Sequence, residues 1–195
     1  MIIVLFGPPG SGKGTQAETV ASRLGVPHVA TGDILRAEVA RGSALGREAE
    51  PIMKSGNLVS DDLIVRVIES RLGEADAQSG ALLDGFPRTV PQAEALDAML
   101  ARSGRAVDEV VALQVSDDEL RRRVLHRAEV EGRADDTMPA FDQRLRTYAT
   151  ETEPVLAYYR GTRTKIVEVD GAGPVDEVTT RIIHALTLDG AGAGA

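Results

Sequence analysis

A glycine-rich segment near the N-terminus combines one lysine with two hydroxyl side chains: Gly7-Pro8-Pro9-Gly10-Ser11-Gly12-Lys13-Gly14-Thr15. Glycines allow the backbone to curl so that several N–H groups point inward and surround phosphate oxygens. Lys13 can neutralise phosphate charge, and a hydroxyl group near the start of a helix can bind or orient Mg²⁺. The general motif has Ser or Thr directly after the lysine, whereas this chain has Gly14 there and Thr15 one position later. The segment predicts a site for a phosphorylated ligand.

The residues on either side of this loop predict a strand before it and a helix after it. Ile2–Phe6 is a short unbroken apolar run, which is typical of a fully buried strand. Gln16–Leu24 has a helical pattern that stops at Gly25, a usual residue just past a helix end. The N-terminus of that helix adds partial positive charge. Because strand, turn and helix are the context that the loop needs, a turn without a ligand is the weaker alternative.

A carboxylate and an arginine follow another buried strand. Ala81–Asp84 is short and ends in a carboxylate, and ligands of parallel sheets bind at the carboxyl ends of strands. Asp84 is therefore suited to bind a magnesium-bound water near the phosphates. Gly85-Phe86-Pro87-Arg88 then predicts a tight turn that brings Arg88 to the same edge. A plain turn with a surface arginine is the alternative.

Arginines cluster in the second half of the chain, at positions 121–123, 127, 133, 144 and 146. A capping-box pattern at 116–119 predicts that a helix begins there, and Arg123 and Arg127 share one of its faces. The net charge of the protein is −8, which argues against a general nucleic-acid binder. The cluster therefore indicates a small polyanion held in a cleft, with a solvated helix face as the alternative.

Length and composition restrict the classes of protein to which this chain can belong. The chain has 195 residues, 43% of them hydrophobic, which is ordinary for one globular domain. Cysteine is absent, so disulfides and cysteine-ligated zinc are excluded. The N-terminal apolar run is too short for a signal peptide, and no segment has the length of a membrane span. We expect a cytoplasmic protein that binds no membrane.

Strands and helices alternate along the chain. Apolar runs predict five strands, at 2–6, 26–30, 81–84, 109–115 and 165–169, which indicates a doubly wound α/β sheet with helices on both faces. His28, in the second strand, is expected to be a core or strand-end histidine rather than a ligand. Residues 31–72 predict a block of successive helices that is longer than a minimal crossover. Thr31 or Asp33 could cap the first of these helices. We interpret this block as an insertion that caps a site.

The second half of the chain contains a predicted loop, a long helix and a tail. Ala128–Gly132 is short and polar and predicts a connecting loop. Residues 138–159 predict a long helical region that is interrupted near Pro154. Residues 189–195 are rich in Gly and Ala and predict a frayed tail.

Four motifs in this order make the chain resemble the adenylate kinase family of nucleoside monophosphate kinases. They are Gly7 to Gln16, Thr31-Gly32-Asp33-Ile34-Leu35-Arg36, Asp84-Gly85-Phe86-Pro87-Arg88-Thr89, and Gly132-Arg133-Ala134-Asp135-Asp136. The resemblance runs from Met1 to about Leu186, and the shift from Gly14 to Thr15 is itself a mark of the family. It implies a single P-loop domain over 1–195, in which helices lie on both faces of a five-stranded parallel sheet. It also implies a monophosphate-binding helical insertion at 31–60.

The family implies roles for the matching positions. Arginines and the loop lysine would act in phosphoryl transfer: Lys13, Arg88, Arg123, Arg133 and Arg144. ATP would contact Gly10, Ser11, Gly12, Lys13, Gly14, Thr15, Arg123, Arg127 and Gly173. AMP would contact Thr31, Arg36, Met53, Lys54, Gly56, Leu58, Val59, Gly85, Arg88, Gln92, Arg133 and Arg144. Asp84, and Thr15 as a second possibility, would hold Mg²⁺ through water.

The resemblance also implies Mg²⁺-dependent transfer between ATP and AMP to give two ADP, by a monomer. Longer members carry an inserted lid domain, sometimes with zinc, whereas here only five residues separate Arg127 from Arg133. This is the short form, with a lid loop at 127–133 and no zinc. The nearest alternative is a UMP/CMP kinase of the same fold, although Gln92 favours adenine. An ATP-hydrolysing switch or binding protein is the alternative from another class.

Overall fold

The computed structural model describes residues 1–131 and 137–187, with the backbone alone at 128–131 and 187. Arg133 and the predicted tail at 189–195 lie outside the described residues. Within the described part of the chain, no helix is both long and apolar enough to cross a membrane.

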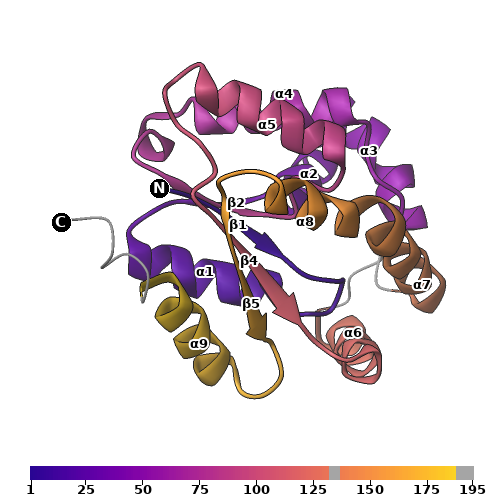
Figure 1. Ribbon diagram of the computed structural model, residues 1–195. Coiled ribbons are helices and arrows are strands. Elements are labelled where there is room, and N and C mark those ends of the chain that lie inside the picture. Colours follow the sequence, from indigo (N-terminus) through magenta and orange to yellow (C-terminus); the bar gives the residue numbers. More distant parts are fainter. Residues whose placement is uncertain (132–136, 188–195) are drawn as a thin grey trace.

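Five parallel strands form one sheet in the order β2-β3-β1-β4-β5, as the predicted α/β class requires (Figure 1). Their bounds are β1 Ile2–Phe6, β2 His28–Ala30, β3 Ala81–Asp84, β4 Glu109–Gln114 and β5 Lys165–Asp170. β1 is central and every residue in it is buried, which explains its unbroken apolar sequence. The register pairs Leu5 with Asp84, so the carboxylate of β3 comes level with the end of β1, beside the loop that follows it.

Helices cover both faces of the sheet (Figure 1). On one face, α1 (Lys13–Leu24) and α9 (Val175–Thr187) bury aliphatic side chains against it. On the other face lie α4 (Asp61–Leu72), α5 (Val90–Ala101) and α8 (Glu153–Arg160), together with a short 3₁₀ turn at Ala75–Ala77. The resulting core is aliphatic with few aromatics.

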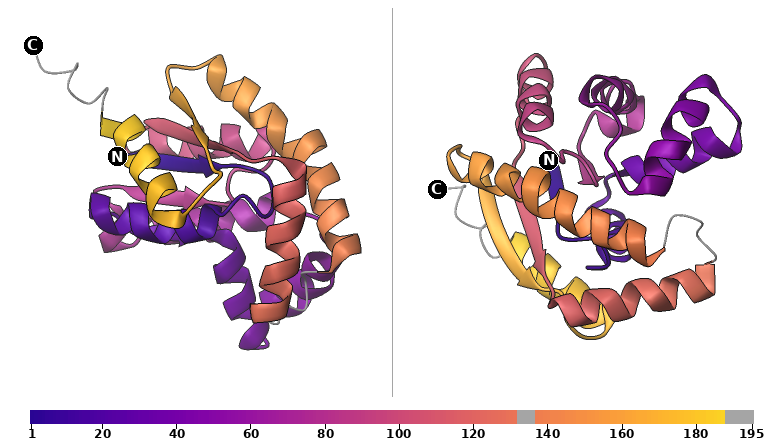
Figure 2. Two further views of the ribbon diagram at one scale, coloured as in Figure 1. Left: turned by 90° about the horizontal axis from the view of Figure 1, so that it is seen from below. Right: turned by 90° about the vertical axis from the view of Figure 1, so that its right-hand side faces the viewer.

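Two helices between β2 and α4 pack on each other and stand out to one side of the sheet (Figure 2). They are α2 (Thr31–Ala40) and α3 (Ala44–Ser55), and α3 contains Pro51 within its length. The N-cap of α2 is Ala30, so neither Thr31 nor Asp33 caps it as the sequence suggested. The reason is that helical geometry begins directly at the end of β2, and the hydroxyl of Thr31 bonds elsewhere.

The predicted loop at 128–132 is mostly helix. Helix α6 runs from Asp117 to Glu131, because alanine and glutamate at these positions are good helix formers. The predicted lid loop at 127–133 is therefore helical as far as Glu131, and its last two residues lie outside the described part.

The long region after this segment is interrupted, as predicted, close to Pro154. It consists of α7 (Met138–Thr147), a π-helical turn (Tyr148–Thr152) and α8. A π-helical turn widens the helix by one residue and often occurs at functional sites.

Candidate active site

A cavity of about 810 Å³ opens at the carboxyl ends of β1, β2 and β3. Its walls come from the glycine-rich loop, α2, the end of α3 with residues 56–59, the turn after β3, and the region around the π-helical turn. This is the edge of a parallel sheet at which ligands bind. The cavity therefore joins the loop at 7–15 to the helical insertion.

The glycine-rich loop has the curled backbone that its sequence predicts. Gly10 and Gly12 have φ of 85° and 89°, in the left-handed region that favours glycine. The N–H of Ser11 donates to the carbonyl of Pro8 at 3.1 Å. A Cβ on Gly10 would lie only 2.9 Å from the carbonyl oxygen of Leu120, because α6 packs directly against the loop.

Replacing Gly10 with alanine should destabilise the protein more than the same change at Gly25. Both glycines have positive φ, but a Cβ on Gly25 would meet no atom within 4 Å. Gly25→Ala should therefore lower the free energy of unfolding by about 1–2 kcal/mol through backbone strain alone. Gly10→Ala should cost about 1–3 kcal/mol more, because α6 must move. Urea unfolding of both variants measures the difference, and equal losses would contradict the close packing of α6 on the loop.

Lys13 lies inside the curled loop and is held by its carbonyl oxygens. Its Nζ donates to Gly7 at 2.6 Å and to Pro8 at 3.0 Å. Burial lowers the pKa of Lys13 to about 8; the carboxylate of Asp84 opposes this shift, while the charges of Arg88 and Arg127 add to it. The lysine is thus a desolvated cation at the floor of the cavity.

Asp84 is an ionised carboxylate opposite this lysine. Burial raises its pKa, but His28 and the charge of Lys13 outweigh that effect, so the pKa of Asp84 lies below its ordinary value. His28 Nε2 lies 3.6 Å from Asp84 Oδ2, at ion-pair distance. His28 is the first residue of β2, a strand-end position as predicted, and it also lines the cavity.

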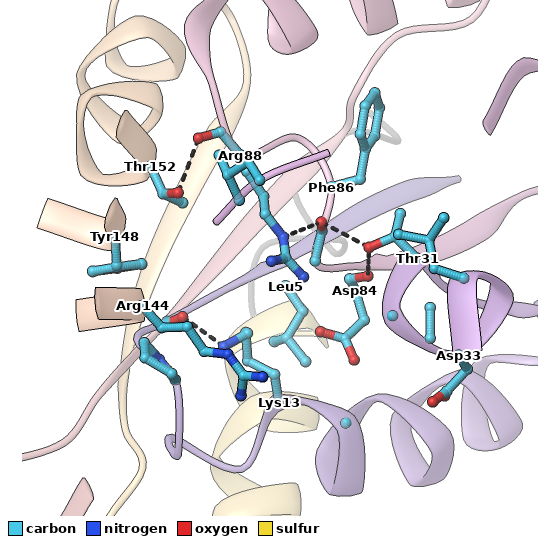
Figure 3. Close-up of a pocket in the computed structure, with 18 of the residues that line it drawn as sticks. Leu5, Lys13, Thr31, Asp33, Asp84, Phe86, Arg88, Arg144, Tyr148 and Thr152 are labelled. Carbon is cyan, nitrogen blue, oxygen red and sulfur yellow. Dashed lines mark hydrogen bonds between the residues drawn. The ribbon is translucent and has the colours of Figure 1, made fainter. Parts of the chain in front are cut away.

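Arg88 is held by its backbone as well as by its side chain. Its N–H donates to Gln92 Oε1 at 2.7 Å, and its carbonyl accepts from Thr152 Oγ1 at 2.9 Å. Its Nε donates to the carbonyl of Gly85 at 2.7 Å, which also accepts from Thr31 Oγ1 at 2.9 Å (Figure 3). The turn at Gly85 thus holds the guanidinium, while Gln92 and Thr152 hold the backbone of the same residue.

Positive charges converge on this part of the cavity. Burial lowers the pKa of Arg88, the charge of Asp84 opposes the shift, and the charges of Arg144 and Arg36 add to it. Figure 3 shows the side chains of Arg88 and Arg144 directed to the same space as Lys13 and Asp84. Like charges are brought together in a protein when an anion is to be bound between them.

Gly85 is required by the close approach of two side chains. Its φ is 76°, and a Cβ would lie 2.7 Å from Arg88 Nη2 and 2.8 Å from Thr31 Oγ1. Any larger residue would displace the arginine or the threonine. Gly85 thus determines where the guanidinium of Arg88 can lie.

Most of the residues predicted to bind nucleotide line this one cavity. The residues that do so are Gly10, Gly12, Lys13, Gly14, Thr15, Thr31, Arg36, Met53, Gly56, Leu58, Val59, Asp84, Gly85, Arg88, Gln92, Arg127 and Arg144. The nucleotide contacts assigned to these positions stay predictions.

Of the predicted residues that the structure describes, four lie outside the cavity wall. Ser11 is buried within the loop, and Gly173 follows β5 with φ of 104°. Lys54 is exposed and pairs with Glu50 at 2.7 Å. Arg123 bonds the carbonyls of Ser11 and Gly171 and the carboxylate of Glu119, so it ties the loop to α6 and to the end of β5.

Sequence reasoning missed several residues of the cavity wall. Tyr148 and Thr152 come from the π-helical turn, and burial raises the pKa of Tyr148 to about 12, with the charge of Glu153 adding to it. The interruption before Pro154 was the one signal that this helix is irregular there. Asn57 also lines the cavity, beside residues that were predicted.

Comparison with known proteins agrees with this geometry. A family model described as adenylate kinase matches residues 5–164. An adenylate kinase of Stenotrophomonas maltophilia is 50% identical over 188 residues, which cover 95% of this chain and 99% of that protein. An adenylate kinase of Phenylobacterium zucineum is 50% identical over 187 residues, 96% of this chain and 98% of its own length. One from Xanthomonas euvesicatoria is 49% identical over 186 residues, with 95% and 99% coverage.

The relatives match over nearly the whole of each chain, and the family model spans the positions of all four sequence motifs. They favour the first interpretation of the sequence over a UMP/CMP kinase and over a nucleotide-dependent switch. With a phosphate loop, an arginine-lined cavity and this degree of identity, the chain belongs to the adenylate kinase family of phosphotransferases.

Proposed function

We propose that this protein catalyses the reversible, Mg²⁺-dependent transfer of a phosphoryl group from ATP to AMP, giving two molecules of ADP. The observation that carries the proposal is the continuity of the cavity, from the phosphate loop to α2 and residues 56–59. Two phosphorylated ligands repel each other, so a site that binds both needs fixed cations between them. Lys13, Arg88 and Arg144 line this cavity and are suited to that role.

In this proposal ATP lies over the loop at 10–15, with Arg127 beside it and Arg123 holding the loop in place. AMP lies between α2 and the turn after β3, with Arg36 and Arg88 on its phosphate. Gln92 and residues 53–59 surround its base, and Arg144 bridges the two nucleotides. Arg133, which lies outside the described residues, is assigned the same bridging role.

The chain's own residues position charge rather than perform covalent chemistry. Phosphoryl transfer needs the two substrates in line and the shifting charge stabilised, and AMP has an ionised phosphate, so a general base is not needed. Water is the competing acceptor, so we expect α2, α3 and the end of α6 to close over the substrates before transfer.

The residues present fit a magnesium ion. Asp84 provides an ionised oxygen donor, and a Cβ on Gly14 would lie 3.5 Å from its Oδ2, so the carboxylate faces the start of α1. Among the described residues, no three His, Asp or Glu side chains gather into a metal site. Mg²⁺ typically binds with few carboxylates and keeps water and phosphate oxygens as its other ligands. The ion would neutralise charge on the transferring phosphate, with Asp84 holding its water and Thr15 as a second candidate.

A bisubstrate analogue, two adenosines joined through five phosphates, tests this assignment most directly. Such a compound should bind far more tightly than ATP or AMP alone, because one molecule fills both ends of the cavity. A coupled assay with AMP, UMP and CMP should show AMP as the best acceptor. ATP hydrolysis that is unaffected by AMP, with no gain in affinity for the analogue, would instead support a switch protein.

ATP binding should become weaker as the pH rises above 8. Lys13 has a lowered pKa of about 8 in the ligand-free protein, so it loses its proton in this range. Phosphate binding favours the charged form and raises that pKa, so binding at pH 8.5 should take up a proton. Titration calorimetry in two buffers of different ionisation enthalpy measures this uptake. Its persistence in Lys13→Met would assign the proton to another group.

A further inference from the structure

The amide of Gln92, assigned above to the base of AMP, is held at its nitrogen end by a carboxylate from another helix. Gln92 Nε2 donates to Asp61 Oδ1 at 2.7 Å. The other oxygen of Asp61 accepts from Thr89 Oγ1 at 3.0 Å, and Thr89 caps α5 by accepting from the N–H of Gln92. Asp61 is the first residue of α4, which lies beside α5 (Figure 1).

The oxygen end of the same amide is held as well. Gln92 Oε1 accepts from the backbone N–H of Arg88 at 2.7 Å. A carboxylate can only accept and a peptide N–H can only donate, so these two partners permit one orientation of the amide. A flip of the amide by 180° would set NH₂ against the N–H and oxygen against the carboxylate. Gln92 is only 2% exposed, so water cannot compensate for such a mismatch.

Each end of the held amide keeps one bonding position. An amide nitrogen has two hydrogens and an amide oxygen has two acceptor sites, and Asp61 and Arg88 take one of each. Gln92 lines the cavity, so the remaining N–H and oxygen are the groups that a base can meet. Adenine presents an acceptor, N1, beside a donor, the 6-amino group, and matches this pair. Hypoxanthine presents a donor, N1–H, beside an acceptor, O6, and would match only a flipped amide.

We propose that Asp61 makes the site prefer AMP over IMP by fixing the orientation of the Gln92 amide. Asp61 does not line the cavity, so it acts as a positioning residue through Gln92. The inference rests on the proposed function, which places AMP at this end of the cavity. Cytosine presents the same order of acceptor and donor as adenine, so this device discriminates against IMP but not against CMP.

The test is the ratio of kcat/KM for AMP to that for IMP, with ATP as donor, in Asp61→Ala. We expect the ratio to fall about tenfold, the typical effect of losing a hydrogen bond to a charged group. The loss should arise from a higher KM for AMP, with kcat and the KM for ATP nearly unchanged. The ratio of AMP to CMP should stay within about twofold, because both bases need the same amide orientation.

Two further variants separate this role from a structural one. Asp62→Ala removes an exposed acidic residue from the same first turn of α4, so it matches the loss of charge at the helix N-terminus. It should leave the AMP/IMP ratio unchanged. Asp61→Asn keeps an oxygen that can accept from Gln92 Nε2 and should retain the ratio within about twofold.

The possible results distinguish a failure of the role of Asp61 from a failure of the proposed function. An unchanged AMP/IMP ratio in Asp61→Ala overturns the inference, and so does an equal loss in Asp62→Ala or in Asp61→Asn. If the wild-type protein phosphorylates AMP and Gln92→Leu loses the discrimination while Asp61→Ala keeps it, only the role of Asp61 fails. If the wild-type protein does not phosphorylate AMP, the proposed function fails and the inference fails with it.

Discussion

Arg88→Ala is expected to lower kcat for ADP formation by about 10²–10³-fold, the effect of removing one donor that acts on developing charge in the transition state. The fold should persist, because the bonds that Arg88 makes to Gln92 and Thr152 come from its backbone. The carbonyl of Gly85 keeps its bond from Thr31. Removal of a buried charge close to Arg36 and Arg144 should leave the melting temperature equal or higher.

The control for this variant is Arg160→Ala. Arg160 is an exposed arginine that pairs with Glu168 at 2.8 Å, outside the cavity. It should retain full turnover, since surface ion pairs contribute little. Coupled assays and thermal melts on both variants measure the contrast. A near-wild-type rate for Arg88→Ala would refute the role assigned to this guanidinium, whereas loss of folding would show that its side chain is structural.

Lys13→Met is expected to reduce kcat by a comparable factor, about 10²–10³. Methionine keeps the length of the side chain but loses the charge and the donors that reach the carbonyls of Gly7 and Pro8. The affinity for ATP should fall because the curled backbone alone then faces the phosphates. The affinity for AMP, measured by equilibrium binding without ATP, should change little, since the proposed AMP site lies at the other end of the cavity.

Lys165→Met is the matched lysine control. Lys165 lies on β5 and donates to the carbonyl of Ala185, away from the cavity. Turnover of this variant should stay within about twofold of the wild type, because Lys165 lies away from the cavity and a substitution there acts on stability rather than on the site. Equal losses in the two lysine variants would mean that the assay reports stability rather than phosphate binding.

The proposed closure would allow this chain, a short form, to exclude water without an inserted lid domain. Helix α6 extends to Glu131, and Arg127 near its end already lines the cavity. On the opposite side, α2 and α3 stand away from the sheet (Figure 2). We expect these two parts to approach each other when both nucleotides bind.

The sequence alone determined the local parts of the site. The glycines at 10 and 12, between an apolar run and a helical pattern, predict a curled loop because positive φ and close backbone approach are properties of single residues. In the same way Asp84 ends one buried strand and Arg88 comes four positions later, so their place at the sheet edge follows from chain connectivity. Five strands and their order along the chain were also predictable from hydrophobic runs.

Only the tertiary structure decided which residues, distant in the sequence, bond to one another and which of them line the cavity. Arg123 and Arg127 are indistinguishable in the sequence as neighbours on one helix face, yet Arg127 lines the cavity while Arg123 bonds the loop and Gly171. Helix α6 extends into the segment that was predicted as a loop. The polar composition of this segment favours a loop, whereas its alanine and glutamate residues favour a helix, and the helix forms.

Asp61 shows most clearly what the sequence alone does not specify. In the sequence it is one of two acidic residues at a helix start, which predicts only a favourable interaction with the helix dipole. The packing of α4 beside α5 places it 2.7 Å from an amide 31 positions away and leaves Asp62 exposed. Such a contact depends on how two helices lie on the same face of a sheet. Periodicity specifies which face of a helix is buried, but the neighbour that it meets there is decided by the packing of the whole chain.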